Sequence, residues 1–302
     1  MTNAQLRRYR PQLVAAAGIA PPFRHRGLLF LSSGTVNSMI TAGLLVVLTQ
    51  ASPVALRQTA EERGLAIAVE ADRRDRGFGD STAALRMVLR SRGGDERSRE
   101  LRSRVLERPD QGDRSLVVFD DPPDVRGTAL LTYANRVGDD DQWLYLPALK
   151  RVRRIAASNR SGPFMGSEFS YEDLASQVVE KFTYRWLRDE ACPGEGFDSL
   201  TCYVIERRPV KASSGYSRQV LWIDQKEYRT VKIDYYDRRE VLLKTLSLSR
   251  YEQHAGRFWR AGNMLMSNHQ TGQNTRLVWS GYKFGVGLRE NDFTPQALAR
   301  AR

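Results

Sequence analysis

Few side chains in this sequence are of the types that carry out catalysis, and none stands in a recognisable catalytic motif. Beyond residue 60 the only histidines are His254 and His269. Serines and carboxylates alternate within residues 167–173, but no histidine stands near them in sequence to act as a placed base. The sequence also lacks G-x-S-x-G, H-E-x-x-H and a glycine-rich phosphate-binding loop. We therefore expect a protein that is not an enzyme and that uses no metal or cofactor.

The two cysteines, Cys192 and Cys202, flank a turn that contains Pro193, Gly194 and Gly196. Such a turn brings the two ends of a hairpin together, so the thiols could form a disulfide in an oxidising compartment. A shared zinc ion is the alternative, but no histidine is close enough in sequence to complete its ligand set. We expect the disulfide.

Residues 1–60 differ in composition from the rest of the chain, because they hold six arginines and no acidic residue. Residues 39–48 form an apolar run as long as the hydrophobic region of a signal peptide, and small residues follow at 51–55. The run is shorter than the roughly 20 residues of a membrane-spanning helix, although an uncleaved N-terminal anchor is the alternative. We expect residues 1–60 to be a leader for export. The leader carries half of the net charge of +12, which weakens a nucleic-acid-binding interpretation.

Residues 61–302 are long enough for one large domain or two small ones. Most of this stretch consists of short runs that alternate polar and apolar residues, joined by tight turns such as 237–240 and 270–273. About eleven such strands predict a mainly β, antiparallel meander. A sheet of this size must curl into a barrel or half-barrel, or split into a sandwich. Helical spacing predicts covering helices at 61–76, 171–179 and 295–301.

Large apolar side chains stand where they could line a cavity. Gly162–Gly166 is a loop whose only large side chains are apolar, which indicates that it packs over another part of the protein. Met264 and Met266 lie on a strand with apolar residues on both faces, and flexible methionines suit a cavity that accepts varied ligands. Trp143 and Tyr145 lie on a predicted half-buried strand. An ordinary β-protein core has the same composition, and the residues alone leave both interpretations open.

Four basic residues lie in one run, Lys150, Arg151, Arg153 and Arg154. As part of a strand they would project on both faces. They could meet anionic lipid headgroups, at about 1 kcal/mol per basic side chain, or an acidic partner. They could equally form a solvated strand that pairs with the acidic turn 139–141.

Three segments carry a resemblance to a known family. They are D-P-P-D-V-R-G-T from Asp121, W-L-Y-L-P-A-L-K-R-V-R-R-I from Trp143 and G-P-F-M-G-S-E-F-S-Y-E-D-L from Gly162. In this order and spacing, the chain resembles the exported outer-membrane lipoprotein-sorting proteins over roughly residues 64–295. That family is similar in fold to the lipoprotein carriers LolA and LolB. The resemblance implies that residues 61–302 form a single domain, an incomplete antiparallel barrel whose apolar concave face is covered by helices.

The resemblance also implies a function. A protein of this family would bind acyl chains in the periplasm, as a carrier of a lipid or an acylated lipoprotein that touches membranes only transiently and binds no nucleic acid. Relatives are often associated with export pumps of the resistance-nodulation-division superfamily, so such a pump is a candidate partner. A non-enzymatic accessory subunit of that exporter is the alternative, and it would need an exposed patch on the convex side. The expected acyl-chain and lid residues are Trp143, Tyr145, Phe164, Met165, Phe169, Met264 and Met266.

Overall fold

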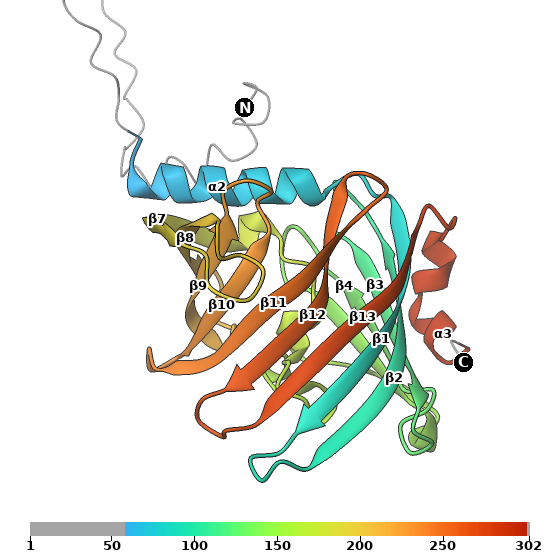
Figure 1. The fold of residues 1–302 in the computed structure, drawn as a ribbon. Helices are drawn as coiled ribbons and strands as arrows, with labels where there is room; N and C mark the ends of the chain where they lie inside the picture. The colour runs from blue at the N-terminus through green and yellow to red at the C-terminus, as the bar shows by residue number, and fades with distance from the viewer. Residues whose placement is uncertain (1–57, 301–302) are drawn as a thin grey trace, which may run out of the picture.

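The computed structural model describes residues 58–300, and all of its strands belong to one antiparallel sheet of 13 strands (Figure 1). Strands β1 to β6 follow one another as neighbours, as do β7 to β13, and β1 pairs with β13. The strands β6 and β7 are therefore the two free edges of an open, curled sheet. This confirms the predicted mainly β fold with an incomplete barrel, with two strands more than expected. The expected leader lies almost wholly outside the described residues.

The strands differ in length from four to thirteen residues. Their bounds are β1 Asp80–Arg90, β2 Glu96–Leu106, β3 Arg114–Asp121, β4 Ala129–Tyr133, β5 Asp141–Leu146, β6 Arg151–Arg154, β7 Phe182–Ala191, β8 Thr201–Pro209, β9 Tyr216–Asp224, β10 Thr230–Asp237, β11 Leu242–His254, β12 Phe258–Asn268 and β13 Asn274–Phe284.

The register of the ladders brings apolar side chains into rows on the concave face. Because residues directly opposite each other in a ladder point to the same side of the sheet, one row runs across five strands. Its members, each opposite the next, are Ile205, Leu221, Ile233, Leu246 and Met266. All five are buried, and they belong to the largest apolar cluster of the structure. The concave face is thus a continuous apolar surface.

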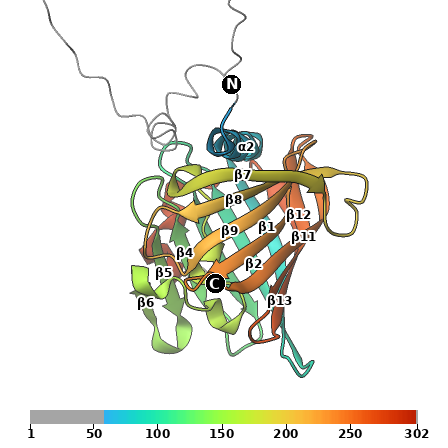
Figure 2. The same cartoon turned by 90° about the vertical axis from the view of Figure 1, so that its left-hand side faces the viewer.

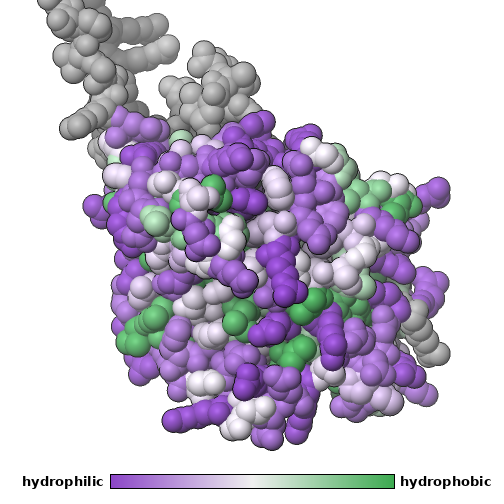
Figure 3. All heavy atoms as spheres, in the orientation of Figure 1, coloured by the Kyte–Doolittle hydropathy of each residue, from purple (hydrophilic) through white to green (hydrophobic). Residues whose placement is uncertain are grey.

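Two parts of the convex face are apolar as well, and each has its own cover. On β3, β4 and β5 the outward side chains form a cluster with Phe293 and Leu298 of the C-terminal segment, which contains the short helix α3 (Pro295–Leu298). On β8, β9 and β10 they pack under the loop 192–200. The side of the molecule drawn in Figure 3 is mainly hydrophilic with separate apolar patches.

The helix α2 (Ala60–Asp75) lies across one open end of the half-barrel (Figure 2). It begins with a capping box. The Thr59 side chain accepts a hydrogen bond from the Glu62 backbone N–H, and the Glu62 side chain accepts one from the Thr59 backbone N–H. Its buried residues include Leu65, Ala68 and Val69, the face predicted from the helical spacing. Within residues 58–300 no helix has both the length and the apolar character needed to cross a bilayer.

The prediction of a helix at 171–179 is wrong. The structure has two short 3-10 turns, Tyr171–Leu174 and Val179–Lys181, with extended residues between them. Gln177 shows the local reason, since its side chain donates to the Ala175 carbonyl and accepts a bond from Arg207. These bonds compete with helical backbone bonds.

The contact between α2 and the edge strand β7 depends on Gly64. A Cβ atom built at Gly64 would lie 2.6 Å from the Trp186 backbone nitrogen and 2.7 Å from the Arg185 carbonyl carbon. Because both neighbours are backbone atoms, the helix could carry a larger side chain here only by moving away from β7.

We expect Gly64→Ala to destabilise the protein, although alanine favours helix by about 1 kcal/mol over glycine. The clash should outweigh this gain and lower the free energy of unfolding by about 1–3 kcal/mol, measured by urea denaturation. Ala66→Gly, at a half-buried position of the same helix, reports the propensity effect alone. A more stable Gly64→Ala protein would contradict the close contact.

Candidate functional site

A cavity of about 860 Å³ lies between α2 and the concave face of the sheet. Its walls come from inward-pointing side chains of many strands, among them Leu85, Ile233, Leu246, Met264 and Leu277. Small-molecule sites typically enclose about 300–1,000 Å³ with mostly apolar walls and few polar groups. We refer to this space as the concave cavity. Its size and apolar walls can hold a long hydrocarbon group.

Charged side chains also line the concave cavity. Several stand at its rim on the α2 side, and Arg136, Asp173 and Arg207 line it elsewhere. Asp72 and Arg76 of the helix end form an ion pair of 2.5 Å, and Asp75 pairs with Arg260 of β12. Burial raises the pKa of Asp72, and the Arg76 charge opposes this shift. Arg257 donates to the Arg76 carbonyl over 2.7 Å. The C-terminal end of α2 is thus held to the β11–β12 hairpin by polar contacts around an apolar space.

The N-terminal half of α2 is attached to the other side of the half-barrel. Arg63 forms an ion pair of 2.8 Å with Asp189 of β7, and its guanidinium lies 3.9 Å from the centre of the Trp186 ring. Leu65 and Val69 pack into the apolar cluster between these two attachments. The helix therefore bridges the two sides of the half-barrel as a cover over the concave cavity.

Residues 155–181, called here the crossing segment, connect the two free edges of the sheet. Phe164 and Phe169 of this segment are buried and contribute to the wall of the concave cavity. Phe164 contacts the rings of Phe119 and Tyr171 at 5.6 and 5.5 Å between centroids. The crossing segment thus fills part of the concave side with its own aromatic side chains.

A buried ion pair fixes the crossing segment to the sheet. The Lys244 ammonium lies 2.7 Å from the Asp173 carboxylate and 2.9 Å from the Glu168 carbonyl. Both side chains are at most 5% exposed. The Tyr216 hydroxyl and the Ser170 backbone also donate to Asp173, at 2.8 and 2.7 Å. A buried charge with this many partners is costly to leave without its counter-ion.

The backbone of the crossing segment is strained at Met165. Its φ of 50° lies in the left-handed region, which non-glycine residues adopt at a cost of about 1–3 kcal/mol. Arg99 of β2 donates to the Met165 carbonyl over 2.6 Å and stabilises this conformation. The loop predicted to be a lid is thus held in place by a polar contact with the sheet.

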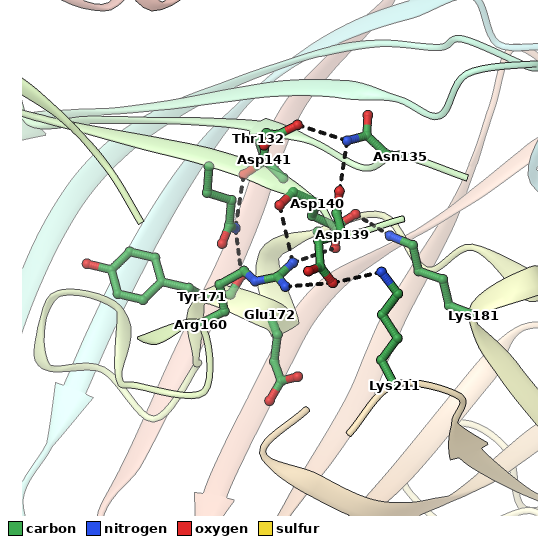
Figure 4. Close-up of polar contacts among 12 residues, drawn as sticks. Thr132, Asn135, Asp139, Asp140, Asp141, Arg160, Tyr171, Glu172, Lys181 and Lys211 are labelled. Carbon is green, nitrogen blue, oxygen red and sulfur yellow. Dashed lines mark hydrogen bonds and ion pairs between the residues drawn. The ribbon is translucent and has the colours of Figure 1, made fainter. Parts of the chain in front are cut away.

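A polar network joins the β4–β5 turn to the crossing segment and to the β8–β9 loop (Figure 4). It lies on the side of the half-barrel where β6 and β7 do not pair, which we call the seam. Asp139 of the β4–β5 turn lies 2.8 Å from Lys211 and 3.0 Å from Arg160, and Asp140 pairs with Lys181, the residue directly before β7. Beside them Arg136 and Glu180 form a pair of 2.8 Å. Ion pairs and side-chain hydrogen bonds therefore hold the seam where a backbone ladder would hold a closed barrel.

The structure brings three of the predicted acyl-chain residues to the wall of the concave cavity, namely Phe164, Phe169 and Met264. Met266 is fully buried in the adjoining apolar cluster, and Met165 packs against that cluster. These two residues therefore pack beside the cavity without lining it.

Trp143 and Tyr145, which were predicted to contact an acyl chain, do not line the concave cavity. Both belong to the convex cluster under Phe293 and Leu298. It is Leu144 between them that points into the concave cluster. Alternation along β5 shows that the strand has two faces, but it does not show which face lies inside, because the C-terminal segment covers the outer one.

Sequence reasoning missed most of the cavity wall. The unpredicted lining residues include Ala68 and Ala71 of α2, Tyr184, Ile205 and Leu248 of the sheet, and Trp279. The sequence offered one signal for these residues, because the side chains that point inward occupy every second position along a strand.

The basic run is exposed on the edge strand β6. Lys150, Arg151, Arg153 and Arg154 are all exposed, and Arg154 forms an ion pair with Asp141. The other acidic side chains of the turn 139–141 are bound by Lys211, Lys181 and Arg160. The predicted pairing with the acidic turn therefore holds for only one of the four cations.

The structure joins Cys192 and Cys202 in a disulfide, with 5.0 Å between their Cα atoms. Cys202 lies on β8 and is fully buried, and the bridge packs against Phe197 and Trp222 on the convex side. The disulfide thus anchors the loop 192–200 on the far side of the sheet from the concave cavity.

We expect Lys244→Met and Asp173→Asn each to lower the free energy of unfolding by about 3–5 kcal/mol, because each leaves a buried charge without its partner. Urea denaturation of both single variants and the double variant measures the coupling, and the double variant should lose less than the sum. Arg188→Met is the control, since its ion pair with Glu190 is also 2.7 Å long but exposed, and exposed pairs contribute about 0–1 kcal/mol. Additive losses would contradict the coupling.

Acid should weaken the seam. The bond from Lys211 lowers the pKa of Asp139, and Arg160 adds to this effect. A carboxyl group with a lowered folded pKa stabilises the protein above its unfolded pKa of about 3.9, and this stabilisation is lost as the pH falls further. We therefore expect Asp139→Asn to be less stable than the wild type at neutral pH, with a difference that shrinks below about pH 4. A difference independent of pH, in thermal unfolding from pH 7 to 2, would contradict this role.

Comparison with known proteins gives relatives over most of the chain. The chain is 47% identical to a candidate outer membrane lipoprotein-sorting protein domain from Vibrio parahaemolyticus, with a TM-score of 0.76, and the match covers 80% of this chain and 100% of that one. It is 33% identical to a DUF1329 family protein from Desulfovibrio piger, with a TM-score of 0.74 and coverage of 80% and 99%.

A LolA superfamily protein from Nitrosomonas europaea has the same fold, at 22% identity and a TM-score of 0.61, over 76% of this chain and 97% of that one. The family model that matches residues 111–300 is described as an uncharacterized protein. No curated protein matches the chain. The resemblance found in the sequence is thereby confirmed: the chain belongs to the family that includes the candidate lipoprotein-sorting domain of V. parahaemolyticus and the DUF1329 protein of D. piger, and it has the fold of the LolA superfamily.

Proposed function

We propose that this protein is a non-enzymatic carrier that binds the acyl chains of a lipid or of an acylated lipoprotein. The observation that supports this most directly is the concave cavity of about 860 Å³, whose lining on the sheet is mainly apolar and to which α2 adds Ala68 and Ala71 beside its charged C-terminal end. The family membership points the same way, because the V. parahaemolyticus relative is described as a lipoprotein-sorting domain.

The energetics of acyl chains explain why such a carrier needs this cavity. Each methylene group that leaves water for an apolar surrounding gains about 0.8 kcal/mol. A chain held between α2 and the concave rows of leucine, isoleucine and methionine would keep most of that gain. Met264 adds flexibility to the wall, since an unbranched thioether adapts to chains of different shape. We infer that the charged rim around Asp72 and Arg260 faces the polar end of the cargo.

We place the carrier in the periplasm. The expected leader would direct export, and the Cys192–Cys202 disulfide suits an oxidising compartment. In this setting the protein would move cargo between membranes, with transient contact at each.

The carrier function is favoured over the accessory subunit of an exporter. An accessory subunit would need a continuous apolar patch on the convex side. In the described part of the chain, the exposed large apolar residues lie on separate turns and strand ends, except that Leu149 and Val152 are close together at β6. They are Val137, Leu149, Val152, Val210, Val241 and Val286. A pump of the resistance-nodulation-division superfamily stays a predicted partner.

Filling the concave cavity tests the proposal. Ala71 lies on the lining of the cavity from α2, and Ala71→Trp would occupy space that several methylene groups need. At about 0.8 kcal/mol per group, the loss of three groups should reduce acyl-lipid binding more than tenfold. Native mass spectrometry of protein purified from the periplasm measures the bound species, and titration with a fluorescent fatty acid measures the affinity.

The matched control is Ala84→Trp, which places the same side chain on the exposed face of β1. This variant should retain its lipid. Wild-type protein that carries no acyl species and binds no fatty acid would refute the carrier function, as would equal binding by both tryptophan variants.

A further inference from the structure

The edge strand β6 presents an exposed basic surface that the cavity does not use. We call Lys150, Arg151, Arg153 and Arg154 together the β6 cations. Every residue of β6 is exposed, and none of the β6 cations contributes to the lining of the concave cavity. From this surface we propose a docking site: the β6 cations attach the carrier to an anionic lipid bilayer.

The first argument is that most of this charge is not neutralised. Only Arg154 has a carboxylate partner, Asp141, and the Arg154 side chain is still 69% exposed in that pair. Within residues 58–300, no acidic side chain lies within ion-pair distance of Lys150, Arg151 or Arg153. Three adjacent exposed cations without counter-ions repel one another, and an anionic surface would relieve this repulsion.

The second argument is the distribution of the side chains over the strand. Arg151 lies opposite Leu146 and Arg153 opposite Leu144, while Arg154 lies opposite Trp143. The cations therefore project from both faces of the edge strand, with the half-exposed Leu149 beside them. Long, flexible cations next to an apolar side chain suit a fluid layer of anionic headgroups over acyl chains.

A protein partner fits this surface less well. Protein interfaces are built around aromatic anchors in well-packed pockets and are depleted of lysine. Among the described residues, the surface at β6 has no exposed aromatic side chain, since Trp143 and Tyr145 of the neighbouring strand pack under the C-terminal segment. A charged edge strand of only four residues also discourages the addition of another strand.

The position of β6 connects this surface to the proposed function. Figure 2 shows β6 at the end of the half-barrel away from α2. Leu146, opposite Arg151, and Ile155, directly after β6, pack against the same apolar cluster as Met165 of the crossing segment. A bilayer bound by the β6 cations would therefore lie near the crossing segment rather than near α2. The inference rests on the proposed carrier function only for the reason why the protein would dock on a membrane. The binding to a membrane is measured independently of cargo.

Co-sedimentation with vesicles tests the docking. Wild-type protein should sediment with vesicles of phosphatidylglycerol and phosphatidylcholine in equal parts, and not with phosphatidylcholine alone. Each basic side chain should contribute about fivefold to the partition coefficient. The triple variant Lys150→Ser, Arg151→Ser, Arg153→Ser should therefore bind about a hundredfold more weakly, and salt should weaken the wild type in the same way.

The control removes three exposed cations elsewhere, as Lys226→Ser, Arg276→Ser, Lys283→Ser. It carries the same net charge as the β6 variant, so it separates the local surface from the overall charge. We expect the control to keep most of the wild-type binding. Equal losses of vesicle binding in the two triple variants would overturn the proposed docking site. The same holds if the wild-type protein does not bind the anionic vesicles.

Two further outcomes are informative. If the wild type does not bind vesicles but binds polyglutamate through the β6 cations, the surface binds an acidic protein and the bilayer proposal fails. Native mass spectrometry of the β6 variant separates docking from cargo binding. Retained acyl species with lost vesicle binding supports docking at β6, whereas a wild type that binds vesicles but carries no acyl species leaves docking intact and refutes the carrier.

Discussion

The structure depends on one constraint: the two edges of the sheet do not pair with each other. A closed barrel satisfies its edge backbone groups by pairing them, whereas here β6 and β7 stay apart. The seam is instead held by side chains, with Asp139 and Asp140 of one side meeting Lys211 and Lys181 of the other. An open sheet also leaves its apolar concave face without a partner layer, and this face must be covered by other parts of the chain.

Two covers meet that need in different ways. The helix α2 spans one open end and packs its apolar face inward, while the crossing segment fills part of the concave side and is fixed by the buried Asp173–Lys244 pair. The two covers together do not fill the interior, and the concave cavity is left between them. The concave cavity is thus a consequence of covering an open sheet at its margins, and its walls are apolar because they are the inner face of that sheet.

The sequence predicted the strands, the helix α2 and three cavity residues, because alternation and helical spacing are local properties. It failed for Trp143 and Tyr145, since alternation separates two faces without showing which one a distant segment covers. It also failed for 171–179, where the Gln177 side chain donates one bond and accepts another in place of helical bonds. The seam could not be predicted at all, because Asp140 and Lys181 meet only after the whole sheet has curled. The orientation of a face and the contacts of a seam are properties of the complete fold.

Photo-crosslinking with a fatty acid that carries a diazirine on its chain tests the central claim most directly, because it shows where on the protein an acyl chain lies. The account predicts crosslinks to the concave side, at residues such as Leu246, Met264 and Ala71, and their suppression by excess unlabelled fatty acid. Crosslinks on the opposite face of the same strands, at Leu265 or Val278, or crosslinks that excess ligand does not suppress, would contradict it.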